Sequence, residues 1–393
     1  MLSNLPQVKS DPLWDLLGQF HADKRSDKID LIVGVYRDDL GQTPVMKKVQ
    51  EAESYLASQV ISKSYGMLSG HLKFNRQMNQ FLLGSRAKMD NQCTIQTVGG
   101  SGALRVIADL IAKISPQSRV WNTEPGYINH KPLMEGAGLQ VKPFPWQAKD
   151  GLLDIEACFS ALEQAVEGDV LLLHGCCHNP TGIDPSLTQW QQFADFCKKK
   201  KLTPFIDMAY QGFGTDPDAD AEGLRLIVEQ FDVVLIAASC SKNMGLYCER
   251  TGVASVITKD ESQRQKLRFL LEGITRANYS MPPNHGAAVA SYLFDSPETW
   301  LDELADCRNR VNGIRQELGA VLRELGAPSS LSAIALQKGM FSMLPFSVEQ
   351  MSVLREQYAI YGVPNGRINI AGLKQADIRT LAAALLAVMT LNK

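Results

Sequence analysis

The chain lacks several features that would place it in a specialised class of proteins. Its 40 Lys and Arg residues are balanced by 42 Asp and Glu, so the net charge of -2 provides no broad attraction for nucleic acid or anionic membranes. No stretch approaches the roughly 18 apolar residues that span a bilayer, and the N-terminus shows no export signal. We therefore expect a cytoplasmic protein with no nucleic-acid or membrane partner.

Cysteine spacing provides no framework for a metal or for disulfides. The eight cysteines include the adjacent pair Cys176 and Cys177, but no C-x-x-C pair and no His/Cys cluster with zinc spacing. We expect buried reduced thiols and no metal. With 393 residues, 45% of them hydrophobic, the chain is long enough for a large α/β subunit or for two domains sharing one core.

Strand and helix patterns alternate between about residue 93 and residue 257. Several short runs are nearly all apolar, which favours a mostly parallel sheet buried on both faces. The candidate strands are Cys93–Thr97, Arg119–Asn122, Val170–His174, Pro204–Asp207 and Val233–Ala238.

The C-terminal part has a different organisation. From Asp302 to Leu325 apolar residues recur every three or four positions, which predicts one long amphipathic helix joining two domains. Beyond it, the sequence predicts a compact α/β cap. Its expected strands are Met340–Leu344 and Arg367–Ile370, and its helical patterns lie around Glu349–Tyr358 and Ala376–Met389.

Two polar segments follow predicted strands. In Val98-Gly-Gly-Ser-Gly-Ala-Leu-Arg105, before a helical pattern that starts at Ala103, glycines and a helix N-terminus could hold a phosphate, although such turns also occur without ligands. The segment His174-Gly-Cys-Cys-His-Asn-Pro-Thr-Gly182 lies at the carboxyl edge of the sheet, where open α/β folds bind ligands. A simple turn is the alternative for it.

Two further segments carry charged side chains at strand ends. Asp207 ends an apolar strand, with Tyr210 three residues later; a buried acid requires a positive partner unless it caps a helix. Lys242 follows another apolar strand among small and apolar neighbours, which lower the pKa of an amine and suit it to Schiff-base chemistry. A solvated surface lysine is the alternative.

In order and spacing, these segments resemble the class I, fold-type I pyridoxal-phosphate aminotransferases, in their aspartate and aromatic amino acid branch. The resemblance runs from about Asp11 to the C-terminus. It implies an α/β fold with a large cofactor-binding domain (46–305) around a mainly parallel seven-stranded sheet between helices, and a small α/β domain (1–45 and 306–393). The most specific matches are Ser241 to Arg250, His178 to Asp184, Asp207 to Phe213, Arg276 to Ser280 and Gly366 to Gly372.

The resemblance assigns roles around pyridoxal 5'-phosphate. Lys242 carries the cofactor and then acts as general base, while Asp207 faces the pyridine nitrogen and His130 supports Asp207. Tyr210 and Asn179 bind the ring's phenolic oxygen. The other implied cofactor contacts are Gly100, Ser101, Gly102, Tyr127, Ser239, Ser241 and Arg250, together with Tyr65 from the neighbouring subunit.

The resemblance also implies amino acid and 2-oxo acid substrates and a homodimer with shared active sites. Arg367 pairs with the α-carboxylate and Arg276, from the partner, with a distal carboxylate. Gly34, Tyr127 and Asn179 are further implied substrate contacts. The paired arginines favour transamination over the decarboxylases and lyases that share the cofactor.

Four positions depart from the pattern of the resembling family. Tyr127 stands where tryptophan is usual, Met281 where asparagine is usual, and Gly99 where a serine often contacts the phosphate; Trp14 stands at a lid position that is usually aliphatic or phenylalanine. The resemblance implies an enzyme that transfers amino groups from aromatic amino acids or aspartate to 2-oxoglutarate, and Tyr127, Met281 and Trp14 favour aromatic donors. A dedicated aspartate aminotransferase is the alternative. A non-catalytic binding protein would be expected to have lost the lysine or gained a DNA-binding segment, and this sequence shows neither. A nicotinamide dehydrogenase would need a G-x-G-x-x-G turn after its first strand, which this sequence does not place correctly.

Overall fold

The computed structural model describes residues 2, 5, 11–86, 91–149 and 152–390. Most of the first ten residues, part of the segment in which no export signal was found, therefore lie outside the described residues. Contacts divide the chain into two units, Met1–Thr43 with Val311–Lys393, and Pro44–Arg310. The second division falls inside helix α11 (Pro297–Glu324), the long helix that the apolar periodicity predicts.

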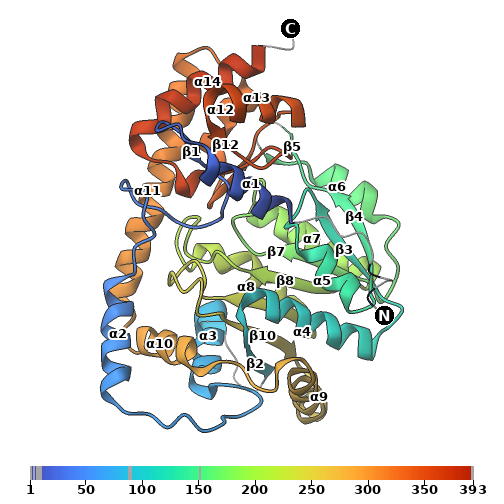
Figure 1. Cartoon of the computed structure of the whole chain (residues 1–393). Helices are drawn as coiled ribbons and strands as arrows, with labels where there is room; N and C mark the ends of the chain where they lie inside the picture. Colours follow the sequence, from blue (N-terminus) through green and yellow to red (C-terminus); the bar gives the residue numbers. More distant parts are fainter. Residues whose placement is uncertain (1, 3–4, 6–10, 87–90, 150–151, 391–393) are drawn as a thin grey trace. The chain divides into compact units, whose positions relative to one another are not determined.

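A seven-stranded sheet forms the centre of the unit Pro44–Arg310 (Figure 1). Its strand order is β2-β10-β9-β8-β7-β3-β4, and only β10 (Thr251–Thr258) runs antiparallel to its neighbours, so the mainly parallel sheet is confirmed. Two members, β10 and β4 (Gln140–Pro145), are not among the candidate strands. The predicted members are β2 (Gln92–Val98), β3 (Arg119–Glu124), β7 (Val170–His174), β8 (Thr203–Met208) and β9 (Val233–Ser239).

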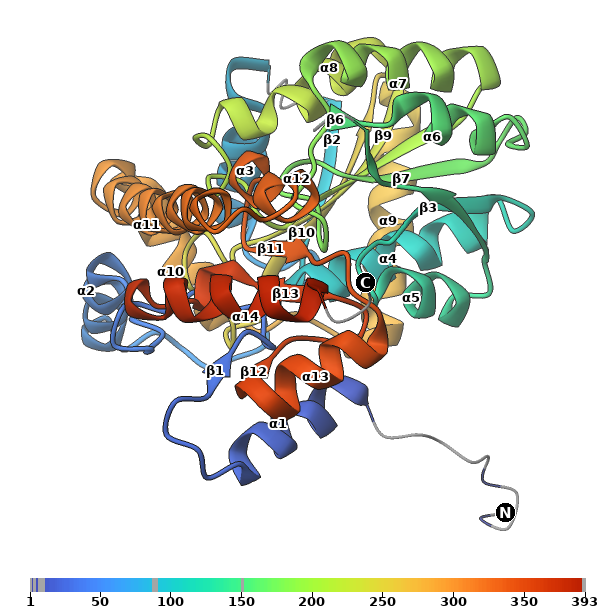
Figure 2. The same ribbon diagram turned by 90° about the horizontal axis from the view of Figure 1, so that it is seen from above.

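Helices cover both faces of this sheet, which explains the nearly continuous apolar strands. On one face, Val170 and Leu172 of β7 share a core with α4 (Gly99–Ile114), α5 (His130–Gly136) and α9 (Glu261–Tyr279). Leu171 and Leu173 point to the opposite face, because side chains alternate along a strand. On that side α7 (Leu187–Lys200) and α8 (Glu222–Gln230) lie side by side (Figure 2). The unit also contains α2 (Lys47–Ser58), α3 (Leu72–Leu83), α6 (Ile155–Leu162), α10 (Asn284–Asp295) and the short strands β5 (Ala148–Lys149) and β6 (Leu152–Leu153).

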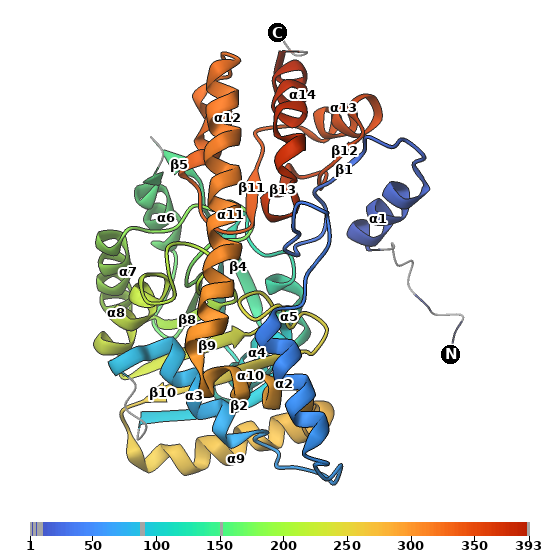
Figure 3. The same cartoon turned by 90° about the vertical axis from the view of Figure 1, so that its left-hand side faces the viewer.

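The other unit joins the N-terminal segment to the C-terminal part of the chain (Figure 3). Strand β1 (Ile29–Asp30) pairs in parallel with β12 (Ile360–Tyr361), and β11 (Phe341–Met343) pairs antiparallel with β13 (Arg367–Asn369). The expected strands and helices of the α/β cap are therefore present. Besides the C-terminal part of α11, its α-helices are α1 (Pro12–Ala22), α12 (Ser329–Ser332), α13 (Val348–Tyr358) and α14 (Ile378–Thr390).

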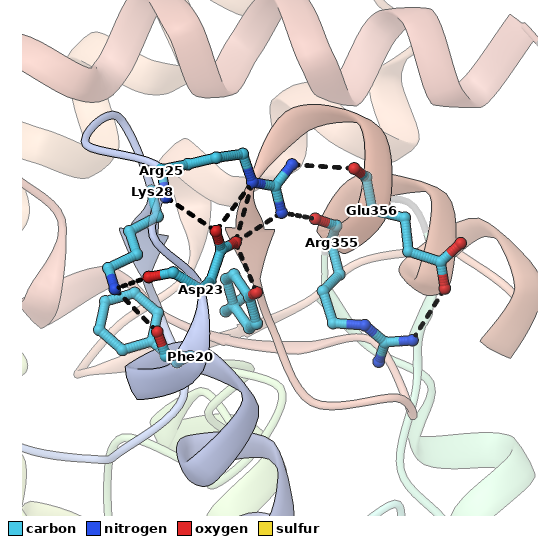
Figure 4. Close-up of polar contacts among 7 residues, drawn as sticks. Phe20, Asp23, Arg25, Lys28, Arg355 and Glu356 are labelled. Atoms are coloured by element: carbon cyan, nitrogen blue, oxygen red, sulfur yellow. Dashed lines mark hydrogen bonds and ion pairs between the residues drawn. The ribbon is translucent and has the colours of Figure 1, made fainter.

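A polar network fastens the end of α1 to α13 and β12 (Figure 4). The Arg25 guanidinium donates to both oxygens of the Asp23 carboxylate through Nε and to Oδ2 through Nη2, and it also donates to the carbonyls of Arg355 and Glu356 near the end of α13. Tyr361 Oη lies 2.7 Å from Asp23 Oδ2. The hydrogen bonds from Arg25 hold the pKa of Asp23 well below its usual range, so the network stays charged over the physiological pH range.

Among the described residues, no helix is both long enough and apolar enough to cross a membrane.

Candidate active site

Three parallel strands end at the same edge of the large sheet. In the sheet register His174 of β7 lies opposite Asp207 of β8, and Asp207 lies opposite Ala237 of β9. Parallel strands point their carboxyl ends to one edge, so the segments that follow β7, β8 and β9 meet there. The predicted site segments containing Asn179, Tyr210 and Lys242 all begin at this edge.

Asp207 is a buried acid whose partner is His130. The Nε2 atom of His130 lies 2.8 Å from Asp207 Oδ2, and its Nδ1 atom lies 3.2 Å from Asn122 Oδ1 in β3. Burial by itself would raise the pKa of Asp207, but the His130 hydrogen bond and the nearby charges, including that of Lys242, outweigh it and lower the pKa. The site therefore keeps a fixed negative charge, and the helix-cap alternative for Asp207 is wrong.

Two further histidines stand beside this pair. The His174 ring lies 4.9 Å from the His130 ring and 4.4 Å from the His178 ring, measured between centroids. Burial lowers the pKa of His174 to about 3 and that of His178 well below its usual value. Both rings are therefore neutral near pH 7, and the negative charge of Asp207 remains available for a cationic ligand.

Lys242 lies in the turn after β9, with its ammonium 4.8 Å from the centroid of the Tyr210 ring. Burial lowers the pKa of its amine from 10.5 to about 8; the Asp207 carboxylate opposes this shift and the Arg250 charge adds to it. Near neutral pH the unprotonated form of this amine is a minority, but a far larger one than in an ordinary lysine, and it is the form that a nucleophile requires. The surface-lysine alternative is wrong for this position.

Tyr210 and Asn179 reach each other across the same edge. Asn179 Nδ2 lies 3.4 Å from Tyr210 Oη, and both side chains are buried. These two polar groups come from segments after β7 and β8. They present a donor and a hydroxyl on the side of the site where Lys242 lies over the Tyr210 ring.

The N-terminus of α4 forms an anion-binding arrangement. The helix begins at Gly99, earlier than the expected Ala103, so Gly100, Ser101 and Gly102 lie in its first turn; glycine and serine carry no apolar periodicity that could reveal this start. The N-cap residue Val98 makes no side-chain hydrogen bond. The Gly99 N–H donates to the Arg250 carbonyl at 2.9 Å, and the N–H groups that follow it in the first turn have no side-chain cap and can face an anion.

Arg250 and two serines stand next to this helix start. Gly99 has a φ of 64°, and a Cβ there would collide with the Arg250 guanidinium. A Cβ on Gly100 would come 3.4 Å from that of Ser239, and both Ser239 and Ser241 are buried. A guanidinium, hydroxyl groups and helix N–H groups are the donors that a phosphate needs.

Tyr127 stands edge-on to His130, with ring centroids 5.2 Å apart, and so belongs to the same group. Tyr65 and Arg276 do not contact these residues in the described contacts. Tyr65 is 94% exposed and lines a pocket of about 800 Å³ together with Met281, and Arg276 is exposed in the last turn of α9.

The remaining predicted residues, Gly34 and Arg367, lie in the unit that contains both termini. The Arg367 guanidinium carbon is 4.7 Å from the centroid of the Phe341 ring, and Nη2 donates to the Ile32 carbonyl at 2.8 Å. A Cβ on Gly34 would collide with the same Phe341 ring. Gly34 and Arg367 therefore both lie against the Phe341 ring.

Sequence reasoning did not single out Asn122 or Phe341. The sequence could have indicated Asn122 as a site residue, because it is a polar residue inside a strand that is buried on both faces. Phe341 carried no such signal, because an aromatic residue in a short strand is common.

Comparison with known proteins adds an independent line of observation. A family model described as aminotransferase class I and II matches residues 26–385. The aspartate aminotransferase of Escherichia coli K12 is 40% identical over 396 residues, covering 99% of this chain and all of that protein. The aromatic-amino-acid aminotransferase of Paracoccus denitrificans is 40% identical over 392 residues, with 99% and 100% covered. The crystal structure of the Burkholderia pseudomallei aromatic-amino-acid aminotransferase, covalently bound to pyridoxal phosphate, has a TM-score of 0.96 at 34% identity, covering 99% of this chain and 100% of that chain.

Proposed function

Because the chain belongs to the aminotransferase class I and II family, we propose that it moves the amino group of an aromatic amino acid or aspartate to 2-oxoglutarate by a ping-pong mechanism, with a lean towards aromatic donors. It is a pyridoxal-phosphate-dependent transaminase. The observation that carries the proposal is the Lys242 amine, with its pKa lowered to about 8, next to the buried Asp207–His130 pair.

The residues of the candidate site fit the cofactor. Asp207 offers the fixed carboxylate that keeps a pyridine nitrogen protonated, and Arg250 with the N-terminus of α4 offers donors for a phosphate. When bound, pyridoxal phosphate supplies an electron-accepting ring. The proposed contacts are Gly100, Ser101, Gly102, Tyr127, Asn179, Asp207, Tyr210, Ser239, Ser241, Lys242 and Arg250, with the partner subunit's Tyr65.

Lys242 is proposed as the group that moves protons. Its amine takes the proton from the substrate Cα and delivers it to C4′ of the cofactor, a task suited to a base with a pKa near the working pH. Tyr210 and Asn179 orient the ring by binding its phenolic oxygen. His130 holds Asp207 in place and exchanges no proton with the substrate.

Two arginines are proposed to bind the substrate. Arg367 pairs with the α-carboxylate in bidentate geometry, near Gly34, and Arg276 pairs with a distal carboxylate. The second arginine explains why both aspartate and 2-oxoglutarate can be accepted. Tyr127 and Asn179 are the other proposed substrate contacts.

Overall similarity does not choose between donors, because the aspartate and the aromatic relative are both 40% identical to this chain. A charge-assisted hydrogen bond to Arg276 would contribute about 1.5 to 3 kcal/mol, and burial of an aromatic ring contributes about the same. Tyr127 and Met281 in place of tryptophan and asparagine, with Trp14 as an apolar lid, shift the balance towards aromatic donors.

The proposal includes a homodimer with shared active sites. Tyr65 and Arg276 are exposed in the single chain, as residues donated to a partner would be.

The proposal also includes a large domain (46–305) and a small domain (1–45 and 306–393), which the two contact-based units support. A cytoplasmic location remains a prediction.

Two measurements test this function. The visible absorbance of the loaded protein should be lost on adding glutamate and restored by an oxo acid; an unchanged spectrum would contradict transamination. Specificity constants for aspartate, phenylalanine and tyrosine, in the parent and in Arg276→Ala, decide the donor. An aspartate advantage above about a thousandfold exceeds what either contact can supply, and would identify a dedicated aspartate aminotransferase.

A further inference from the structure

The turn after β7 places two adjacent thiols beside a buried carboxylate. The Sγ atoms of Cys176 and Cys177 and a carboxylate oxygen of Asp220 all lie within 4.8 Å of one another. The three residues are only 4%, 2% and 6% exposed. None of the described cysteines forms a disulfide.

The backbone of the turn brings the two thiols together. Adjacent side chains point in opposite directions along an extended chain. Cys177, however, has a φ of 53°, in the left-handed region that costs a non-glycine residue about 1 to 2 kcal/mol. Asp184 holds this conformation, because its two carboxylate oxygens accept the N–H of Cys177 at 2.7 Å and of His178 at 2.8 Å.

Asp220 is equally fixed. Its carboxylate accepts the backbone N–H groups of Gly212, Gly214 and Thr215 at 2.8 to 2.9 Å. These hydrogen bonds orient the carboxylate beside the two thiols, as outer partners orient the ligating carboxylates of metal sites.

We propose that Cys176, Cys177 and Asp220 form a binding site for a thiophilic divalent cation of the Zn²⁺ or Cd²⁺ type. Binding converts two thiols to thiolates: two metal–sulfur bonds form, two S–H bonds break, and two protons leave to solvent with no redox change. The Asp220 carboxylate donates a lone pair as the third ligand. Hard ions such as Mg²⁺ should not bind, because thiolates select soft metals.

Binding should be slow and should inhibit turnover. The ligands are almost fully buried, so the turn must open before an ion enters. Cys177 is followed directly by His178 and Asn179, and Asn179 is a cofactor contact in the proposed function. The inhibition therefore rests on that proposal, whereas the binding itself does not.

Titration of the cofactor-loaded protein with Cd²⁺ tests the site. We expect thiolate-to-cadmium absorbance in the ultraviolet, release of about two protons per ion, and no signal with Mg²⁺. Cys176→Ala and Cys177→Ala should each weaken binding by more than about 100-fold. Cys248→Ser, which removes an exposed thiol, should bind as the parent does.

Two results would overturn the site. One is equal Cd²⁺ affinity in the parent and in both alanine variants. The other is a Cys248→Ser variant that shows no thiolate-to-cadmium absorbance at saturating Cd²⁺. Neither result depends on transaminase activity.

Discussion

The imidazole of His130 lies 2.8 Å from the Asp207 carboxylate, and both side chains are buried. The two residues come from different elements, His130 from the start of helix α5 and Asp207 from strand β8. This contact is among the interactions that keep the acid ionised despite burial. The charge that a cationic ring would meet therefore depends on a neighbour distant in sequence.

Replacing His130 should weaken cofactor binding without unfolding the protein. In His130→Gln, the pKa of Asp207 should rise because burial is then opposed by fewer favourable contacts. The cofactor dissociation constant should increase about 10 to 100-fold, the equivalent of one charge-assisted hydrogen bond. Fluorescence titration with pyridoxal phosphate measures it, with the exposed His21→Gln as control. Equal affinities in the two variants would remove His130 from the site.

The pKa of Lys242 should be visible in the apoprotein. Reaction of its amine with an amine-selective reagent should increase with pH around a midpoint of about 8, well below the ordinary 10.5. Arg250→Gln should raise this midpoint and Asp207→Asn should lower it, because the two charges act in opposite directions. Shifts of the reverse sign would contradict the electrostatic picture.

The same amine should affect folding stability. Between pH 8 and 10.5 the unfolded chain holds a proton on Lys242 that the folded apoprotein has lost, so stability should rise with pH in this window. Lys242→Met should lack that contribution. Denaturant unfolding of both proteins at several pH values measures the free energy of unfolding. If it changes with pH equally in the two proteins, Lys242 contributes nothing to the pH dependence of stability.

Lys242→Ala should abolish turnover while leaving the fold intact. A positioned general base contributes roughly 10² to 10⁴-fold, and the covalent link to the cofactor is lost as well. Lys259→Ala, at a partly exposed lysine paired with Asp232, is the control and should retain activity. Near-normal turnover in Lys242→Ala would refute the central role of this residue.

Gly99→Ala should lower phosphate affinity more than backbone strain alone would. Both Gly99 and Gly138 have a positive φ, but a Cβ on Gly99 would collide with the Arg250 guanidinium, whereas one on Gly138 would meet no atom within 4 Å. Gly138→Ala therefore has comparable strain without displacing Arg250. Comparing the dissociation constants of pyridoxal phosphate for the two variants isolates the effect of displacing Arg250. Similar values would mean that displacing the guanidinium does not change cofactor affinity.

Sharing of residues between subunits can be tested by mixing two inactive proteins. Lys242→Ala lacks the base, and Arg276→Asp should turn over dicarboxylates poorly. If the partner donates Arg276, mixed dimers contain one intact site and should recover part of the dicarboxylate activity. Dissociation and reassociation of the mixture measures this, and no recovery would argue against shared sites.

The sequence analysis did not predict β4 and β10, and each has a physical feature that hides it. β4 contains Pro143 and Pro145, which normally argue against a strand, yet β4 lies at the edge of the sheet where proline is tolerated. β10 mixes Thr, Gly, Ala and Ser with its apolar residues, so it shows neither alternation nor a continuous apolar run. It pairs with β2 and β9 at its two edges, helices pack against it, and every one of its residues is buried.

The sequence by itself determined the strand that carries Asp207 and the strand that precedes Lys242, because apolar runs and the residues that follow them are local properties of the chain. It also determined the family through five ordered motifs. Only the tertiary structure decided the contact of His130 with Asn122, the pKa of Lys242, the collision that a Cβ on Gly99 would make with Arg250, and the approach of Asp220 to Cys176 and Cys177. Each depends on side chains from different elements, and burial and distance between such groups are set by packing that no local pattern encodes.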